Sequence, residues 1–137
     1  MAWTFDSLKV GDKDFIQKVI TAEMVDTFAD LSEDHNPVHV DEAFAKTTPF
    51  GRRIAHGMLT ASLISAVLGI KIPGNGSIYM GQSIRFKAPV FLGDKLTVWA
   101  EVKEKIEEKE RVVMTTWAEN AEGVVVLEGE ALLLFRR

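Results

Sequence analysis

Two short segments of the sequence hold the side chains best suited to acid–base chemistry. The first, residues 32–40, contains Asp34 and His39 with an Asn36-Pro37 pair between them. An Asn-Pro turn folds such a segment back, so the carboxylate and the imidazole can face one small volume. Together they can hold and deprotonate a water molecule and return the proton elsewhere. The alternative is that Asp34 and Asn36 only hydrogen-bond their own backbone, as these residue types often do in loops.

The second segment is His56-Gly57, directly before a long apolar run. The first N–H groups of a helix have no acceptor within it and can bind a partial negative charge, such as a polarised carbonyl oxygen. Glycine lets a ligand approach the backbone closely. The alternative is that His56 caps the helix and Gly57 only permits tight packing.

In the first half of the chain, helices are expected to flank and position these two segments. Residues 13–20 favour a strand, and Thr21 is expected to cap a helix over residues 22–31. Residues 32–40 are expected to be a loop, followed by a short helix that Asp41 caps and that continues to Lys46. The run that starts at His56-Gly57 predicts an enclosed helix to Leu68, ended by Gly69.

The second half changes to a strand pattern from Ser77 onward. Apolar and polar residues alternate over residues 95–103, and further strands are expected near 110–119 and 124–135. Short polar connections between these strands favour hairpins. The sequence therefore predicts a single α+β domain over residues 1–137, an antiparallel sheet covered by one hydrophobic helix.

Composition excludes several classes of function. The chain has 16 Lys and Arg against 20 Asp and Glu, a net charge of −4, which argues against binding a nucleic acid through its phosphates. It has no cysteine, which rules out disulfides, thiolate metal sites and a cysteine nucleophile. No targeting segment is visible, and the apolar run over residues 58–70 is too short and too polar to span a bilayer. We therefore expect a cytoplasmic protein that binds neither nucleic acid nor membrane.

Together, the two reactive segments resemble the MaoC-like hydratases, most closely the (R)-specific enoyl-CoA hydratases. The shared patterns are D-x-N-P-x-H at residues 34–39 and I-x-H-G-M at residues 54–58, and the resemblance continues through residues 76–83 and 86–94. It implies a hot-dog fold, in which a long antiparallel sheet wraps a hydrophobic central helix. It also implies a homodimer, formed when two sheets join edge to edge.

The resemblance implies a hydro-lyase that adds water to trans-2-enoyl-CoA and gives (R)-3-hydroxyacyl-CoA, with dehydration as the reverse reaction. Asp34 would be the general base, and His39 would share the water and relay a proton. The N–H of Gly57 would bind the thioester oxygen, which gains negative charge in the transition state. Short- to medium-chain substrates are expected, with no metal or redox cofactor; coenzyme A is part of the substrate.

Other residues receive smaller roles. Asn36 is expected to shape the loop and orient Asp34, Ser65 to lie toward the pocket, and His35 to be a surface residue. Strand aromatics lie in cores more often than at interfaces, so the core is the favoured place for Tyr79, Trp99 and Trp117. The candidates for binding the phosphates of coenzyme A are Arg85, Lys87, Lys95 and Lys103. The alternative is that these basic residues only form a solvent-exposed face of the strands.

Two rival functions remain open. A hot-dog thioesterase would hydrolyse the thioester, and many such enzymes carry a catalytic carboxylate on the central helix. Residues 57–68 contain no Asp or Glu, which disfavours that reaction. The other rival is a non-catalytic acyl-CoA-binding subunit, in which loss of Asp34 or His39 would be expected.

Overall fold

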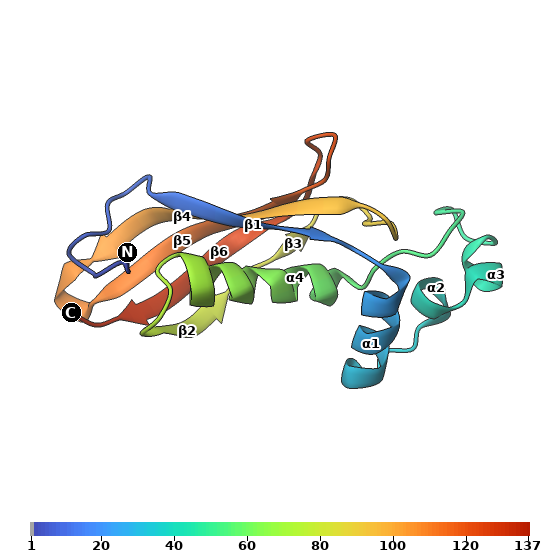
Figure 1. The fold of residues 1–137 in the computed structure, drawn as a ribbon, viewed down its shortest axis with the longest axis horizontal. Helices are drawn as coiled ribbons and strands as arrows, with labels where there is room; N and C mark the ends of the chain where they lie inside the picture. Colours follow the sequence, from blue (N-terminus) through green and yellow to red (C-terminus); the bar gives the residue numbers. More distant parts are fainter. Residues whose placement is uncertain (1) are drawn as a thin grey trace.

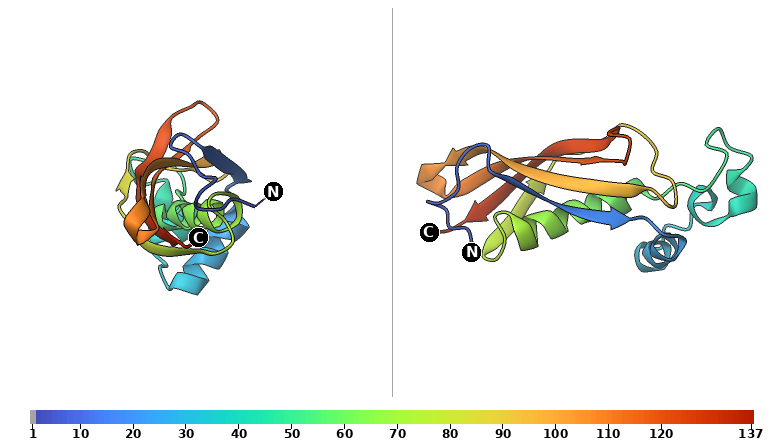
Figure 2. Two further views of the ribbon diagram at one scale, coloured as in Figure 1. Left: turned by 90° about the vertical axis from the view of Figure 1, so that its left-hand side faces the viewer. Right: turned by 45° about the horizontal axis from the view of Figure 1, so that its top comes forward.

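A computed structural model describes residues 2–137, which form one six-stranded antiparallel sheet around a hydrophobic helix (Figure 1). The strands are β1 (Lys13–Val19), β2 (Ser77–Gln82), β3 (Arg85–Phe86), β4 (Lys95–Ile106), β5 (Arg111–Glu119) and β6 (Val125–Phe135). They lie in the order β1-β4-β5-β6-β2, and β3 also pairs with β6. Seen end-on, the strands curve around the helix (Figure 2). This is the α+β hot-dog arrangement that the sequence predicts.

Alternation along the long strands separates an inner from an outer face. In β4, Leu96, Val98 and Ala100 are fully buried, as their period of two predicts. Trp99 points to the opposite face and stacks on Trp117 of β5, with ring centroids 5.8 Å apart. The placement of these tryptophans in the core is therefore wrong, because both occupy outward positions of the pleat.

The central helix is α4 (Gly57–Ala66), and it continues as a π-helical turn, η1 (Val67–Lys71). The prediction that Gly69 ends the helix is wrong, because Val67 and Leu68 continue the buried face of α4 and Gly69 lies inside the π turn. The helix is also less enclosed than expected. Met58 is 59% exposed, and Ser62 and Ser65 on the same face of α4 are exposed as well, so this side of the helix has no cover within residues 2–137.

Short helices lie beyond the N-terminal end of α4 (Figure 1). They are α1 (Ala22–Ser32), α2 (Pro37–Val40) and α3 (Glu42–Ala45). Thr21 caps α1 by accepting a hydrogen bond from the Met24 N–H, and Asp41 caps α3 through the Phe44 N–H, both as predicted.

The prediction of a continuous loop over residues 32–40 is wrong. The Asn36 side chain accepts a hydrogen bond from the Val38 N–H, and Pro37 occupies the first helical position, so the Asn-Pro pair starts α2. This single turn of helix positions His39. No helix within residues 2–137 is both long enough and apolar enough to cross a membrane.

Candidate active site

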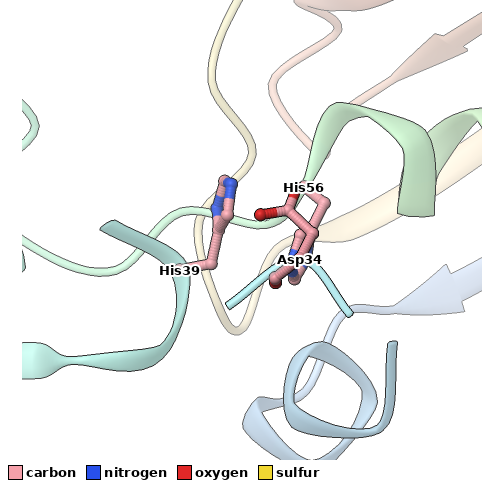
Figure 3. A group of neighbouring side chains, drawn as sticks. All are labelled: Asp34, His39 and His56. Carbon is pink, nitrogen blue, oxygen red and sulfur yellow. The ribbon is translucent and has the colours of Figure 1, made fainter. Parts of the chain in front are cut away.

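A cavity of about 450 Å³ opens where the N-terminus of α4 meets α2 and the segment around β3. Most of its lining is apolar, including Ile54, Val90 and Leu127. Asp34, His39 and His56 also line it, and Figure 3 shows these three side chains brought together from separate segments. An apolar cavity with a few converging polar groups is the usual form of a small-molecule site.

Asp34 lies in the turn that follows α1. The helix ends at Ser32, and the capping residue that follows, Glu33, has a left-handed φ of 66°, which turns the chain toward the cavity. The Asp34 carboxylate accepts a hydrogen bond from the Asn36 N–H at 3.2 Å, and the Asp34 N–H donates to the Ser32 hydroxyl. The side chain is otherwise exposed, which leaves its second oxygen accessible to a ligand.

His39 is half-buried on α2, and one of its ring nitrogens is already engaged. Its Nδ1 lies 2.8 Å from the Ile54 carbonyl oxygen, which can only accept, so Nδ1 carries the hydrogen. In the neutral ring, Nε2 therefore has a free lone pair. Burial lowers the pKa of His39 below its ordinary value, outweighing the raising effect of the Ile54 carbonyl, and the nearby His56 lowers it further.

Asn36 contacts both Asp34 and α2, the helix that carries His39. Its side chain caps α2, and its carbonyl accepts a hydrogen bond from the His39 N–H at 2.9 Å. The contact with Asp34 comes from its backbone N–H. Asn36 thus positions the residues on both sides of it.

Arg53 is a positioning residue that sequence reasoning missed. Its guanidinium donates to the His39 carbonyl at 2.5 Å and to the Asp26 carboxylate at 2.6 Å, which ties α2 to α1. The side chain is 13% exposed. An arginine in a loop gives no sign in the sequence that it is buried in this way.

His56 is the second residue whose role the sequence did not reveal. Its ring is 2% exposed, and its Nε2 donates to the Asp34 carbonyl at 2.9 Å. The ring lies against Phe28 and His39, with centroid distances of 4.9 Å and 4.0 Å. The interpretation of His56 as a helix cap is wrong for the side chain, which makes no capping hydrogen bond within residues 2–137.

Gly57 is the first residue of α4 and lines the cavity. Its N–H points out of the helix start, where α-helical hydrogen bonding offers it no acceptor. A Cβ at this position would lie 2.6 Å from the Phe86 ring, which is too close. The structure thus supports tight packing at Gly57 and leaves its N–H placed to bind an oxygen.

The remaining predicted residues are distributed around the molecule. Ser65 is exposed on α4 and lies away from the cavity. Among the candidate phosphate ligands, Lys87 lines the cavity and its Nζ lies 3.7 Å from Glu128, and Lys103 pairs with Glu130 on the sheet. His35 is on the surface and is bonded to Asp30, which raises its pKa.

Lys95 and Arg85 also lie away from the cavity. Lys95 is exposed at the start of β4, and Arg85 is exposed on β3, where it lines a second hollow together with Glu128 and Glu130. Of the proposed phosphate ligands, Lys87 alone is among the described residues that line the cavity with Asp34 and His39.

Asp34, His39 and His56 also lie close enough together to share a cation. Asp34, His39 and His56 each offer a ligand atom, and these atoms lie within 4.8 Å of one another. One nitrogen of each imidazole already donates to a carbonyl, so His39 Nε2 and His56 Nδ1 are the nitrogens left for another partner. The expectation of no metal stays a prediction.

Comparison with known proteins agrees with this geometry. Residues 11–124 match the family model described as "MaoC like domain". The chain belongs to the MaoC-like family. Among the curated members it resembles, the (R)-specific enoyl-CoA hydratase of Aeromonas caviae is 50% identical over 93% of this chain and 95% of its own. The 3-hydroxybutyryl-CoA dehydratase of Methylorubrum extorquens is 46% identical over 94% of this chain and 82% of its own.

Solved structures of this family share the fold of the chain. The (R)-hydratase PhaJ1 from Pseudomonas aeruginosa superimposes with a TM-score of 0.95 at 45% identity, over 99% of this chain and 87% of that one. The (R)-hydratase of A. caviae, described as involved in PHA biosynthesis, has a TM-score of 0.92 at 49% identity, over 94% and 98% of the two chains. The MaoC-like hot-dog fold expected from the sequence is confirmed.

Proposed function

We propose that this chain is a hydro-lyase that catalyses the reversible, (R)-specific hydration of trans-2-enoyl-CoA to (R)-3-hydroxyacyl-CoA. The observation that carries the proposal is the pairing of Asp34 with the free Nε2 of His39 in an apolar cavity, beside the first N–H groups of α4. The names of the A. caviae hydratase and of a 47% identical (R)-specific enoyl-CoA hydratase from Rhodospirillum rubrum support the same reaction.

In this proposal the water is held by two acceptors. Because His39 Nδ1–H is bonded to Ile54, neutral His39 accepts at Nε2, and the Asp34 carboxylate accepts the other water hydrogen. The water oxygen then directs a lone pair at the β-carbon of the substrate. Asp34 removes a proton from the water as the C–O bond forms, and the alkene electrons move toward the thioester oxygen.

The proton then returns to the substrate on the same face. It passes from Asp34 to His39 Nε2 and from there to the α-carbon, which restores both residues and balances the addition. The lowered pKa of His39 helps this last transfer, because a less stable imidazolium is a stronger acid. Because the water attacks only the face of the β-carbon that Asp34 and His39 line, a single hand of the product is expected.

The N–H of Gly57 is proposed to bind the thioester oxygen. That oxygen is nearly neutral in the substrate and gains charge in the enolate-like transition state, so a fixed donor lowers the barrier. The chemistry needs no metal and no redox cofactor. Coenzyme A enters as part of the substrate, and Lys87 is the residue best placed at the cavity to meet one of its phosphates.

The test is turnover of crotonyl-CoA, followed by loss of the conjugated enoyl-thioester absorbance. A coupled (R)-specific or (S)-specific dehydrogenase reads the hand of the product, and a thiol reagent detects free coenzyme A. Rapid loss with (R) product and no thiol is expected. Release of thiol would instead establish a thioesterase, and saturable binding without turnover would establish a binding subunit.

We also propose substrates of short to medium chain length and action in the cytoplasm, where acyl-CoA thioesters are made and consumed. The dehydratase relative from M. extorquens is named for the short 3-hydroxybutyryl group, and crotonyl-CoA is the matching alkene. The ratio kcat/KM over a series of enoyl-CoA substrates of increasing length should be highest at the short end. A maximum at long chains would contradict this choice.

A homodimer is the proposed assembly, with the edge strand β2 at its interface. The sheet ends at β1 and β2, and β2 exposes Ile78, Tyr79 and Met80 at 55%, 39% and 50%. An unpaired apolar edge favours pairing with a second copy. The double variant Ile78→Asp with Met80→Asp should sediment as a monomer where the parent protein sediments as a dimer, and an unchanged dimer would exclude this edge.

A further inference from the structure

Within residues 2–137, the His56 side chain makes one hydrogen bond, from its Nε2 to the Asp34 carbonyl at 2.9 Å. This bond joins residues 22 positions apart and connects the turn after α1 to the start of α4. Because a carbonyl oxygen only accepts, the ring must carry its hydrogen on Nε2. The bond is therefore specific for one tautomer of His56.

We infer that His56 is a positioning residue, which holds Asp34 in register with His39 and Gly57 through the hydrogen bond that its Nε2–H donates. The inference rests on the proposed function, in which those three residues act on the water and the thioester. His56 touches each of them in a different way. It hydrogen-bonds the backbone of Asp34, and it precedes Gly57 in the chain. Its ring centroid lies 4.0 Å from the ring centroid of His39.

Asp34 needs such support because little else holds it. It is exposed, and its other hydrogen bonds are to Ser32 and Asn36, which belong to the same turn. Those contacts shape the turn but do not place it relative to α4. The His56 ring is itself held between Phe28 and His39, so it forms a fixed point for the turn. A displacement of about 1 Å in a reacting group can cost roughly 100-fold in rate.

Two variants separate the hydrogen bond from the packing. His56→Gln keeps an amide N–H near the place of Nε2 but loses the ring. His56→Phe keeps a ring between Phe28 and His39 but loses the donor. If His56 acted only by filling space, the phenylalanine variant would be the better enzyme. If it acts by holding Asp34, the glutamine variant is better.

We expect His56→Phe to lower kcat by roughly 10- to 100-fold, with KM for crotonyl-CoA changed by less than about threefold. His56→Gln should recover at least about tenfold of that loss. Equal kcat in the two variants, or a better phenylalanine variant, would overturn the inference. Thermal melts of both proteins establish that each is folded at the assay temperature.

A measurement on the unaltered protein keeps the inference testable if either variant fails to fold. The chain has three histidines, so long-range ¹H–¹⁵N correlations resolve each ring. We expect His56 with its hydrogen on Nε2 and His39 with its hydrogen on Nδ1. A His56 ring protonated only at Nδ1 could not donate to Asp34, and this result would overturn the inference.

Failure of the inference is distinguishable from failure of the proposed function. Full activity of an Asp34→Asn variant would remove the proposed site itself. An inactive Asp34→Asn variant together with a fully active His56→Phe variant would leave the site in place and overturn only the role of His56.

Discussion

The substitution Asp34→Asn tests the proposed base directly. Asparagine has nearly the shape of aspartate, and its carbonyl oxygen can still accept the hydrogen bond from the Asn36 N–H. The backbone carbonyl of residue 34 remains available to His56. The turn should therefore keep its conformation, while the side chain loses the ability to take a proton from water.

The size of the loss follows from what remains in the cavity. His39 Nε2 and the Gly57 N–H are untouched, so binding of the water and of the thioester should persist. Removal of a general base typically costs about 10²- to 10⁴-fold in rate, which is roughly 3–5 kcal/mol in activation free energy. KM should change little. Because Asp34 is exposed, the free energy of unfolding should change by less than about 1 kcal/mol.

The assay is initial-rate hydration of crotonyl-CoA over a range of substrate concentrations, coupled to an (R)-specific dehydrogenase. His35→Gln is the matched control, because His35 neighbours Asp34 but faces solvent and bonds to Asp30. The control should turn over at the parent rate. An Asp34→Asn variant that is folded and retains more than about a tenth of the parent kcat would refute the assignment of Asp34 as base.

Other outcomes follow from the same geometry. Since burial holds the pKa of His39 below its ordinary value of 6.5 and the neutral ring must accept from water, kcat/KM should stay level as pH falls to about 6.5 and decline only below it; a decline already complete above pH 6.5 would contradict this. Gly57→Ala should lower both activity and melting temperature, because the new Cβ would lie 2.6 Å from Phe86; in a Phe86→Leu background the melting temperature should recover, and a loss of kcat that persists there isolates the effect on the thioester oxygen. Prolonged dialysis against a chelator should leave kcat unchanged, whereas loss of activity restored by a divalent cation would show that Asp34 and the two cavity histidines hold a metal.

The long elements of the fold were predictable from the sequence because their patterns are local. Alternation in β4 and the capping residue Thr21 each report on a few neighbouring positions, and the structure confirms both. The errors fall where distant contacts decide the outcome. Glycine is the residue type that most often ends a helix, but at Gly69 the helix continues. Val67 and Leu68 are buried and extend it through a π turn. What Trp99 meets on the outer face, namely Trp117, depends on the register of β4 with β5, which no local pattern reveals.

The same distinction explains which parts of the site the sequence could indicate. Asp34 and His39 stand in one short segment with a distinctive spacing, so the sequence alone is enough to propose them as partners. His56 and Arg53 act across the fold: one donates to the Asp34 carbonyl, and the other donates to the His39 carbonyl. Backbone carbonyls carry no sequence signal, because every residue has one. Residues that position the proposed catalytic pair by its main chain are therefore the part of the site that sequence reasoning misses, and they become visible once the hydrogen bonds of the two segments are traced.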